Sequence, residues 1–448
     1  MPRSIFLELK DALHADLSSR IRFVGLPLGV EVTYRDRMSH QETLGRPLSL
    51  PSGVTLKNRL AKSAMSEQLG TKESSPTEGL VRAYERWGSG GAGLLVTGNV
   101  MIDRRALGEP GNVVLEDERD MELFGRWARA GNAAGSTVWM QVNHPGRQSP
   151  RMASKEPVAP SAVPLEGFGG VFAQPRALEE KEIEQIVARF ARTAELAAKA
   201  GFQGIQIHGA HGYLISQFLS PRTNLRTDGW GGTPAKRRRF LLEVVRGCRS
   251  ALGSGRSLGL KLNSADFQRG GFSEEESMEV VETLNSEKLD LLEISGGTYE
   301  RPPWIDENKL RPSTRSREAY FLEYAEKVRK IARMPIMLTG GMRSASGMAS
   351  AIESGAVDVV GLARPLAVEP DLPKRILAGE CERAIELELE TGIRKLDDFL
   401  EASWYQQQIQ RMANGEEPDP ASCRLGAIVK GLVHAFTHRP RPPADVRA

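Results

Sequence analysis

Residues 257–264 read SLGLKLNS, and residues 273–286, after a short loop, read SEEESMEVVETLNS. The first stretch is short, apolar and alternating, as a β-strand is, and the second places Ser273 three residues before Glu276, the spacing of a helix capping box. Seven further units repeat this order of strand, loop and amphipathic helix. Strands are predicted at residues 59–66, 92–99, 136–143, 202–208, 257–264, 289–295, 335–340 and 357–362, and helices near 77–90, 118–134, 179–200, 234–252, 273–286, 318–333, 344–354 and 369–378.

Regular alternation of strand and helix predicts an α/β fold with a parallel sheet. Eight units allow an open, doubly wound sheet or a closed (β/α)8 TIM barrel, and the count of eight favours the barrel. The chain then divides into an N-terminal extension (1–45), partly disordered, a barrel (46–379) and a helical C-terminal extension (380–448). A proline-rich insertion, residues 144–178, follows the third strand and has the length of a functional lid.

Composition limits the kinds of partner. Hydrophobic residues make up 40% of the 448 residues and charged residues 26%, as in globular proteins. Sixty basic residues against 57 acidic ones give a net charge of +3, too small to indicate nucleic acid or a membrane surface, so a small-molecule substrate is expected. Three cysteines without a C-x-x-C motif exclude a disulfide framework and a Cys-ligated metal cluster. With no long apolar run and no secretion signal, a cytoplasmic protein is expected.

Residues 208–213 read HGAHGY directly after the fourth strand, and the chain has only seven histidines. On a helix-initiating turn, His208 and His211 would share a face and could both donate to one carbonyl oxygen. Tyr213 stays protonated at neutral pH and could donate as well. Two other interpretations are ordinary packing and a zinc site, although no third ligand stands in a motif such as H-E-x-x-H.

Polar residues and glycines also lie within or directly after other predicted strands. The loops after strands seven and eight, with Gly340-Gly341 and Ala363-Arg364, have the position and chemistry of a phosphate site. Alternation in strand five sends Lys261 into the barrel, where a buried ammonium needs a negatively charged partner. Gln141 and Ser66 would complete a ring of hydrogen-bonding groups around a planar heterocycle.

These residues resemble the old yellow enzyme family of FMN-dependent NAD(P)H oxidoreductases over about residues 46–378. The resemblance is carried by LKNR (56–59), AMS (64–66), QVNHPGR (141–147), APS (159–161), HGAHGYLISQFLSP (208–221), NLRTD (224–228) and the glycine pair at 340–341. The segment 208–228 is the most specific of these.

The resemblance implies a non-covalently bound FMN and assigns a role to each site residue. Cofactor binding would fall to Ala64, Met65, Ser66 (near O4 and N5), Gln141 and Lys261 (at the pyrimidine edge, with Lys261 by N1 and O2), and to Gly340, Gly341, Ala363 and Arg364 (at the phosphate). His208 and His211 would bind the substrate carbonyl, and Tyr213 would protonate the carbon α to it. NAD(P)H would supply the hydride, and no metal is implied.

The family pattern is not matched everywhere. Ala64 stands where proline is usual, Ser66 where threonine or cysteine is commoner, and Lys261 where many members have arginine. Tyr299 and Trp304, in the loop after strand six, are expected to line the substrate pocket. The family's oligomers suggest that Ser403-Trp404-Tyr405 covers a neighbouring subunit of a homo-oligomer.

An ene-reductase acting on α,β-unsaturated carbonyl compounds is the leading hypothesis. An NADH oxidase or oxidative amine demethylase on the same barrel, and a non-catalytic flavin- or phosphate-binding barrel, are the alternatives.

Overall fold

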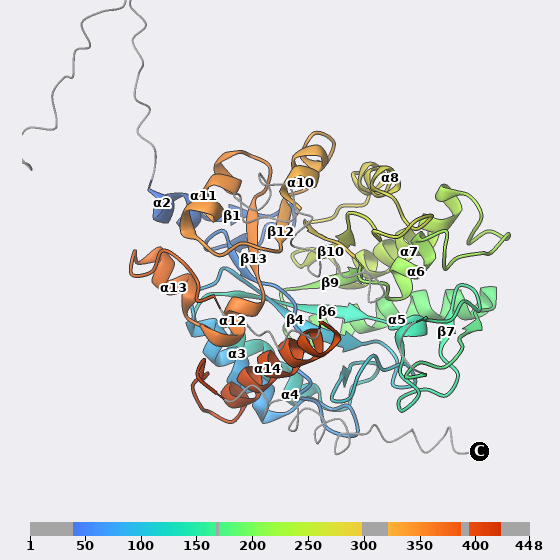
Figure 1. Ribbon diagram of the computed structural model, residues 1–448, viewed down its shortest axis with the longest axis horizontal. Helices are drawn as coiled ribbons and strands as arrows, with labels where there is room; N and C mark the ends of the chain where they lie inside the picture. The colour runs from blue at the N-terminus through green and yellow to red at the C-terminus, as the bar shows by residue number, and fades with distance from the viewer. Residues whose placement is uncertain (1–38, 167–169, 298–320, 387–393, 423–448) are drawn as a thin grey trace, which may run out of the picture. The chain divides into compact units, whose positions relative to one another are not determined.

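The structure of the protein is a computed structural model that describes residues 39–166, 170–297, 321–386 and 394–422. Within these ranges, eight parallel strands form a closed barrel (Figure 1). Closure comes from the first barrel strand, which pairs with both the second and the last. The predicted TIM barrel is therefore confirmed. Its strands are β3 (Leu60–Lys62), β4 (Leu94–Met101), β6 (Thr137–Asn143), β9 (Gly204–Gly209), β10 (Ser257–Asn263), β11 (Leu291–Ser295), β12 (Ile336–Thr339) and β13 (Val359–Leu362).

Seven of the predicted helices follow their strands as expected, with the capping box of Ser273 and Glu276 in place. They are α3 (Glu78–Ser89), α4 (Met121–Asn132), α5 (Glu180–Lys199), α7 (Pro234–Leu252), α8 (Glu274–Leu284), α10 (Leu322–Arg329) and α11 (Ala345–Glu353).

The helix predicted near 369–378 is present but shorter, as α13 (Leu372–Leu377), and a short helix that was not predicted, α12 (Arg364–Val368), precedes it. Glu369 separates them with a ψ of 73°, because the following Pro370 disfavours a helical conformation at the residue before it.

Several smaller elements surround the barrel. Helix α2 (His40–Gly45), the antiparallel pair β1 (Leu48–Ser49) and β2 (Thr55–Leu56), and β5 (Val113–Val114) lie outside the eight units. The 144–178 insertion contains the 3-10 helix η1 (Gly146–Gln148) and the parallel pair β7 (Val158–Ala159) and β8 (Arg176–Ala177). Arg226, after α6 (Leu214–Leu219), donates to the Pro160 carbonyl at 3.0 Å and pairs with Asp228 at 2.6 Å. The motifs at 159–161 and 224–228 thus hold the insertion to the barrel.

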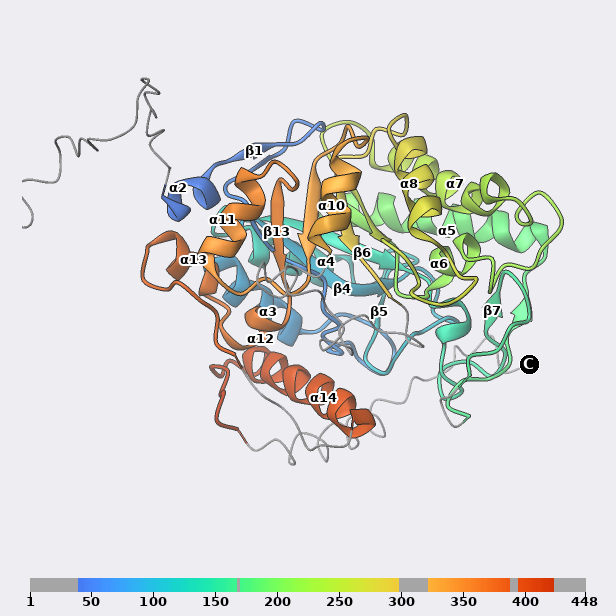
Figure 2. The same ribbon diagram turned by 45° about the horizontal axis from the view of Figure 1, so that its top comes forward.

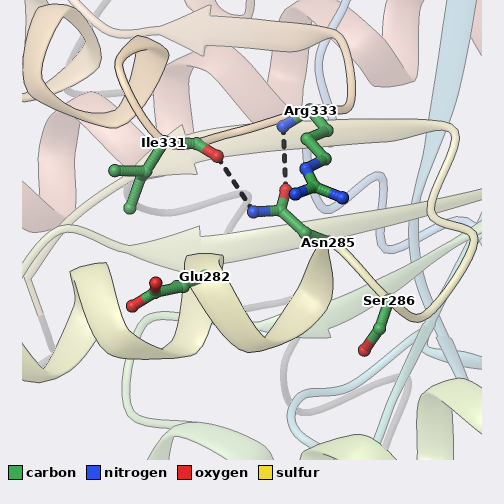
Figure 3. A pocket seen from close by; sticks show the side chains of 5 residues that line it. All are labelled: Glu282, Asn285, Ser286, Ile331 and Arg333. Carbon is green, nitrogen blue, oxygen red and sulfur yellow. Dashed lines mark hydrogen bonds between the residues drawn. The ribbon is translucent and has the colours of Figure 1, made fainter.

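The loops that connect each helix to the next strand lie at the N-terminal end of the barrel. After α8, the Asn285 side chain donates to the Ile331 carbonyl at 2.9 Å and accepts from the Arg333 amide at 2.8 Å, in the loop that leads into β12 (Figure 3). Glu282 and Ser286 complete a hollow of about 370 Å³ there. Because active sites of TIM barrels lie at the opposite end, this hollow is not the candidate site.

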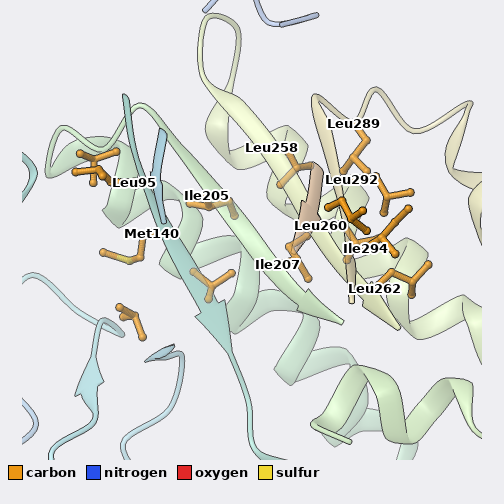
Figure 4. Packing of buried hydrophobic residues seen from close by; sticks show 14 of the residues in the cluster. Leu95, Met140, Ile205, Ile207, Leu258, Leu260, Leu262, Leu289, Leu292 and Ile294 are labelled. Atoms are coloured by element: carbon orange, nitrogen blue, oxygen red, sulfur yellow. The ribbon is translucent and has the colours of Figure 1, made fainter. Parts of the chain in front are cut away.

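The core has an outer and an inner part. Outward-facing leucines and isoleucines of the strands, such as Ile207, Leu260 and Ile294, pack with the helices in the large buried cluster (Figure 4). A second cluster fills the N-terminal half of the interior, where β1 and β2 contribute a cover through Leu50 and Leu56. Its other buried members are Ala61, Leu94, Val96, Trp139, Leu291, Met337 and Val359. Apolar side chains thus fill the N-terminal half of the barrel interior, and polar residues occupy its C-terminal end.

Helix α14 (Arg394–Ala413) packs on α3 and α12 of its own chain (Figure 2). Trp404 is completely buried there, against Val368. The burial of Trp404 therefore needs no neighbouring subunit, and the homo-oligomer stays a prediction. In the part of the chain that the structure describes, no helix is both long enough and apolar enough to cross a membrane.

Candidate active site

A polar layer crosses the barrel above the inner apolar cluster. Lys261 on β10 and Glu293 on β11 lie in register, and the Lys261 Nζ is 3.0 Å from the Glu293 Oε1. Glu293, which has no exposed surface, also accepts from Gln206 Nε2 at 2.6 Å and from Thr339 Oγ1 at 2.7 Å. Gln206 in turn accepts from Gln141 Nε2 at 2.7 Å. Three donors compensate the buried carboxylate.

The prediction that Lys261 enters the barrel and has an acidic partner is confirmed. Sequence reasoning did not name that partner, Glu293. The signal was present, because alternation in LDLLEIS (289–295) places Glu293 on the opposite face from Leu292 and Ile294.

A second buried ion pair fixes the segment that follows β3. Lys62 has no exposed surface, and its Nζ donates to the Val96 carbonyl at 2.9 Å and lies 3.8 Å from Glu67 Oε1. Burial lowers the pKa of Lys62 to about 8, although the negative charge of the nearby Glu67 acts to raise it. Tyr84 on α3 donates to the same carboxylate at 2.5 Å. Glu67 is thereby anchored beside Ser66, at the carboxyl end of β3.

The two imidazoles meet, although not in the predicted way. His208 ends β9, whereas His211 lies in a loop with a left-handed φ of 58°, and helix α6 begins only at Leu214. The predicted helical turn at His208 is therefore wrong. The ring centroids are nevertheless 5.1 Å apart and nearly perpendicular, because the left-handed turn at His211 folds the loop back over the strand end.

Both imidazoles are neutral at physiological pH. Burial, together with the nearby His211 and Lys261, holds the pKa of His208 well below its usual value. Burial and Lys261 lower the pKa of His211 to about 3. The Nδ1 of His208 accepts from the Ala210 amide at 3.3 Å, which leaves the proton on Nε2 as a donor. The Nε2 of His211 is 2.7 Å from Ser295 Oγ.

Tyr213 stands beside His208, with ring centroids 4.7 Å apart. Its hydroxyl accepts from Asn99 Nδ2 at 3.4 Å. Among the described residues, buried amide atoms at this end of the barrel lack partners: Asn99 Oδ1 and both amide atoms of Asn143. Asn143 shares a strand face with Gln141 and so points inward. Burying a donor or acceptor without a partner costs free energy. These unpartnered atoms therefore fit a bound polar, planar group that would form hydrogen bonds with them.

Ser66 donates to Glu109, a half-buried residue of the loop after β4. The same carboxyl accepts from Gln68 Nε2 at 2.6 Å, and burial raises its pKa to about 7. Sequence reasoning missed Glu109, because Ser66 and Gln68, which bind its carboxyl group, lie some 40 positions away in the chain. Ala64 and Met65 are partly buried and pack on the inner and the outer cluster, respectively.

The loops after β12 and β13 carry the predicted phosphate residues. Gly340 and Gly341 have φ values of 135° and 82°, which other residues rarely adopt. Ala363 precedes α12, and Arg364 begins it. The Arg364 guanidinium contacts Glu401 of α14. Thr339, directly before Gly340, donates to Glu293, so the loop after β12 begins beside the polar layer.

Two predicted substrate residues, Tyr299 and Trp304, lie outside the described residues. No group of three His, Cys, Asp or Glu side chains within the described ranges has the arrangement of a metal site.

A sequence model of the NADH:flavin oxidoreductase / NADH oxidase family matches residues 43–382. The NADH-dependent flavin oxidoreductase nadA of Aspergillus parasiticus is 39% identical over 359 residues, which cover 76% of this chain and 80% of the relative. The corresponding iccE of Talaromyces variabilis is 34% identical, covering 83% of this chain and 98% of the relative. The iliE of a Neonectria species is longer, and the 36% identical match spans only 51% of it.

Solved structures agree with this family assignment. The old yellow enzyme homologue from Zymomonas mobilis superimposes with a TM-score of 0.66 at 25% identity, covering 77% of this chain and 95% of that one. Morphinone reductase gives a TM-score of 0.65 at 26% identity, covering 78% and 92%. The chain therefore belongs to the NADH:flavin oxidoreductase / NADH oxidase family, the old yellow enzyme family that its motifs resemble, and is an oxidoreductase of that family.

Proposed function

We propose that the chain binds FMN non-covalently and uses NADH or NADPH to reduce the activated C=C bond of a small α,β-unsaturated carbonyl compound. The observation that carries the proposal is the pair of neutral imidazoles beside a phenol, at the end of a barrel whose interior presents Lys261. Relatives named as NADH-dependent, and a morphinone reductase solved in complex with tetrahydroNAD, support a nicotinamide as the hydride source.

The chain's own residues would hold the cofactor at two ends. Lys261 and Gln141 would face the pyrimidine edge, joined to each other through Glu293 and Gln206. Ala64, Met65 and Ser66 would lie at the opposite edge, and Gly340, Gly341, Ala363 and Arg364 would bind the phosphate. Bound there, FMN would supply a single group able to accept a hydride and to donate one.

The imidazoles and the phenol would act on the substrate. His208 donates from Nε2, and we assign His211 the second hydrogen bond to the same carbonyl oxygen. As a hydride reaches the β-carbon, negative charge grows on that oxygen, and two neutral donors stabilise it without a charged ground state. Tyr213 O–H then delivers a proton to the α-carbon, which completes the addition of two hydrogens.

Tyr213→Phe tests the assignment of the acid. We expect the rate of enone reduction to fall about 10²- to 10⁴-fold, while the rate at which NADH bleaches the flavin stays within about twofold. Tyr324→Phe is the matched control, because the Tyr324 hydroxyl is also buried but donates to Ser277 at 2.7 Å, outside the barrel. Single-turnover stopped flow under anaerobic conditions separates the two half-reactions.

Equal slowing of both half-reactions by Tyr213→Phe would remove the phenol from the mechanism. Turnover of NADH with oxygen that enones do not affect would favour the NADH oxidase alternative.

A further inference from the structure

The C-terminal helix lies beyond the residues that the family model matches, yet it is docked firmly on the barrel. The match ends at residue 382, and α14 starts at Arg394. Trp404 fills a fully buried position against Val368 of α12. At the far end of the helix, Arg82 Nε of α3 donates to the Ala413 carbonyl at 2.6 Å.

The chain after the helix also folds back onto it. Gln408, which is completely buried, donates to Ser422 Oγ at 2.8 Å and accepts from the Asp419 amide at 2.7 Å. Helix α14 is therefore held from Trp404 to its C-terminal end.

One face of this helix reaches the predicted phosphate loop. Glu401 forms an ion pair with Arg364, and about a third of each side chain is exposed, 29% and 35%. The Tyr405 phenol lies in the field of Arg364, Glu401 and Arg343, and its burial raises its pKa. Arg364 begins α12 directly after β13, and Arg343 follows β12. Glu401 therefore contacts the first of these segments, and the Tyr405 phenol lies in the field of both.

We propose that α14 is a positioning element of the cofactor's phosphate site, in which Glu401 orients the Arg364 guanidinium and Trp404 keeps the helix on α12. The proposal rests on the proposed function, since it takes the flavin phosphate as the ligand of Arg364. A guanidinium has five donors in a planar fork, so its chemistry allows it to contact a carboxylate such as Glu401 and a phosphate at the same time.

Glu401 has two opposing effects on phosphate binding. Its negative charge repels the phosphate, but this repulsion is screened because both side chains reach solvent. Its hydrogen bond immobilises a long, flexible side chain before the ligand arrives, which removes an entropic cost worth about two- to tenfold in affinity. The orienting effect is the larger one, so Glu401 is expected to strengthen binding.

Glu401→Gln in the full-length, flavin-free chain tests this inference, with FMN and riboflavin as the two probes. Titration followed by flavin fluorescence should show an FMN dissociation constant raised about two- to tenfold. Riboflavin lacks the phosphate, so its dissociation constant should change less than twofold. Glu417→Gln is the matched control: it removes a carboxylate that pairs with Arg86 at 2.9 Å, away from Arg364, and should change neither constant.

An FMN affinity that is unchanged or higher in Glu401→Gln would overturn the proposal, as would an equal loss for riboflavin or an equal effect of Glu417→Gln. Trp404→Ala should raise the FMN constant at least as much, and Trp404→Phe should restore it. Arg364→Met separates the phosphate site itself from its positioning by α14. Should wild type bind neither flavin, or bind both equally, the proposed function and this inference fall together. Should Arg364→Met abolish the preference for FMN while Glu401→Gln keeps it, only the role of α14 falls.

Discussion

Glu293 is the residue on which the buried polar layer depends. It accepts from a lysine, an amide and a hydroxyl supplied by β10, β9 and β12. A buried carboxylate with this many donors joins neighbouring strands and also limits how far the Lys261 ammonium can move toward a ligand. Its importance follows from its partners, which are distant in sequence.

Replacing Glu293 with Gln should lower the free energy of unfolding by about 3–5 kcal/mol, because it leaves the Lys261 charge buried without a counter-charge. Urea denaturation of the flavin-free chain measures the loss. The double variant Lys261→Met/Glu293→Gln is the control, and it should recover part of that loss. If the double variant were as unstable as the sum of the two single variants, the two residues would not be energetically coupled.

Glu109 should give the protein a pH-dependent stability. Its pKa is raised to about 7, so between about 4.5 and 7 the unfolded chain releases this proton while the folded chain keeps it. The folded state then binds more protons, and stability falls as pH rises through that window. Glu109→Gln should flatten this part of the profile of unfolding free energy against pH. Glu122→Gln, at an exposed position of α4, is the control and should leave the profile as in wild type. If Glu109→Gln also kept the wild-type profile, Glu109 would not be the source of the pH dependence.

Among the elements, the turn after β12 has two consecutive glycines with positive φ. Gly341→Ala should cost about 1–2 kcal/mol of stability, since φ is 82° there, and should weaken FMN binding by distorting the phosphate loop. Gly355→Ala is a matched control with the same kind of strain, at a φ of 74° and with open space around its Cβ, but after α11. It should lose stability and keep FMN affinity, as measured by thermal unfolding and fluorescence titration. Equal FMN affinities in the two variants would show that the turn does not bind the phosphate.

Most helices and strands could be predicted from the sequence, because the patterns that mark them are local. Alternation located β10 and the inward side of Lys261, and the capping box located the start of α8. The differences also have local causes: Glu369, which precedes Pro370, is not helical, so the last predicted helix starts later, at Leu372. The left-handed conformation of His211 replaces a helical turn. A left-handed residue that is not glycine carries no reliable sequence signature.

For the whole molecule, eight strand–helix units were enough to predict the closed barrel, because the alternation of elements sets a parallel sheet and the count sets its closure. The contacts that complete the site could not be predicted in this way. Glu109 reaches Ser66, and Glu401 reaches Arg364, across 43 and 37 positions of sequence, and neither pair belongs to a motif. Such contacts depend on how separate elements pack, which no single segment encodes.

We propose that the carboxyl end of this barrel holds a flavin, which a nicotinamide reduces and an activated alkene reoxidises. The most direct measurement is the visible spectrum of the FMN-reconstituted chain under anaerobic conditions, during addition of NADH or NADPH and then of 2-cyclohexenone. We expect the flavin band to bleach with the nicotinamide and to return with the enone. A chain that retains no FMN, or a bleached band that cyclohexenone and other enones leave unchanged, would contradict it.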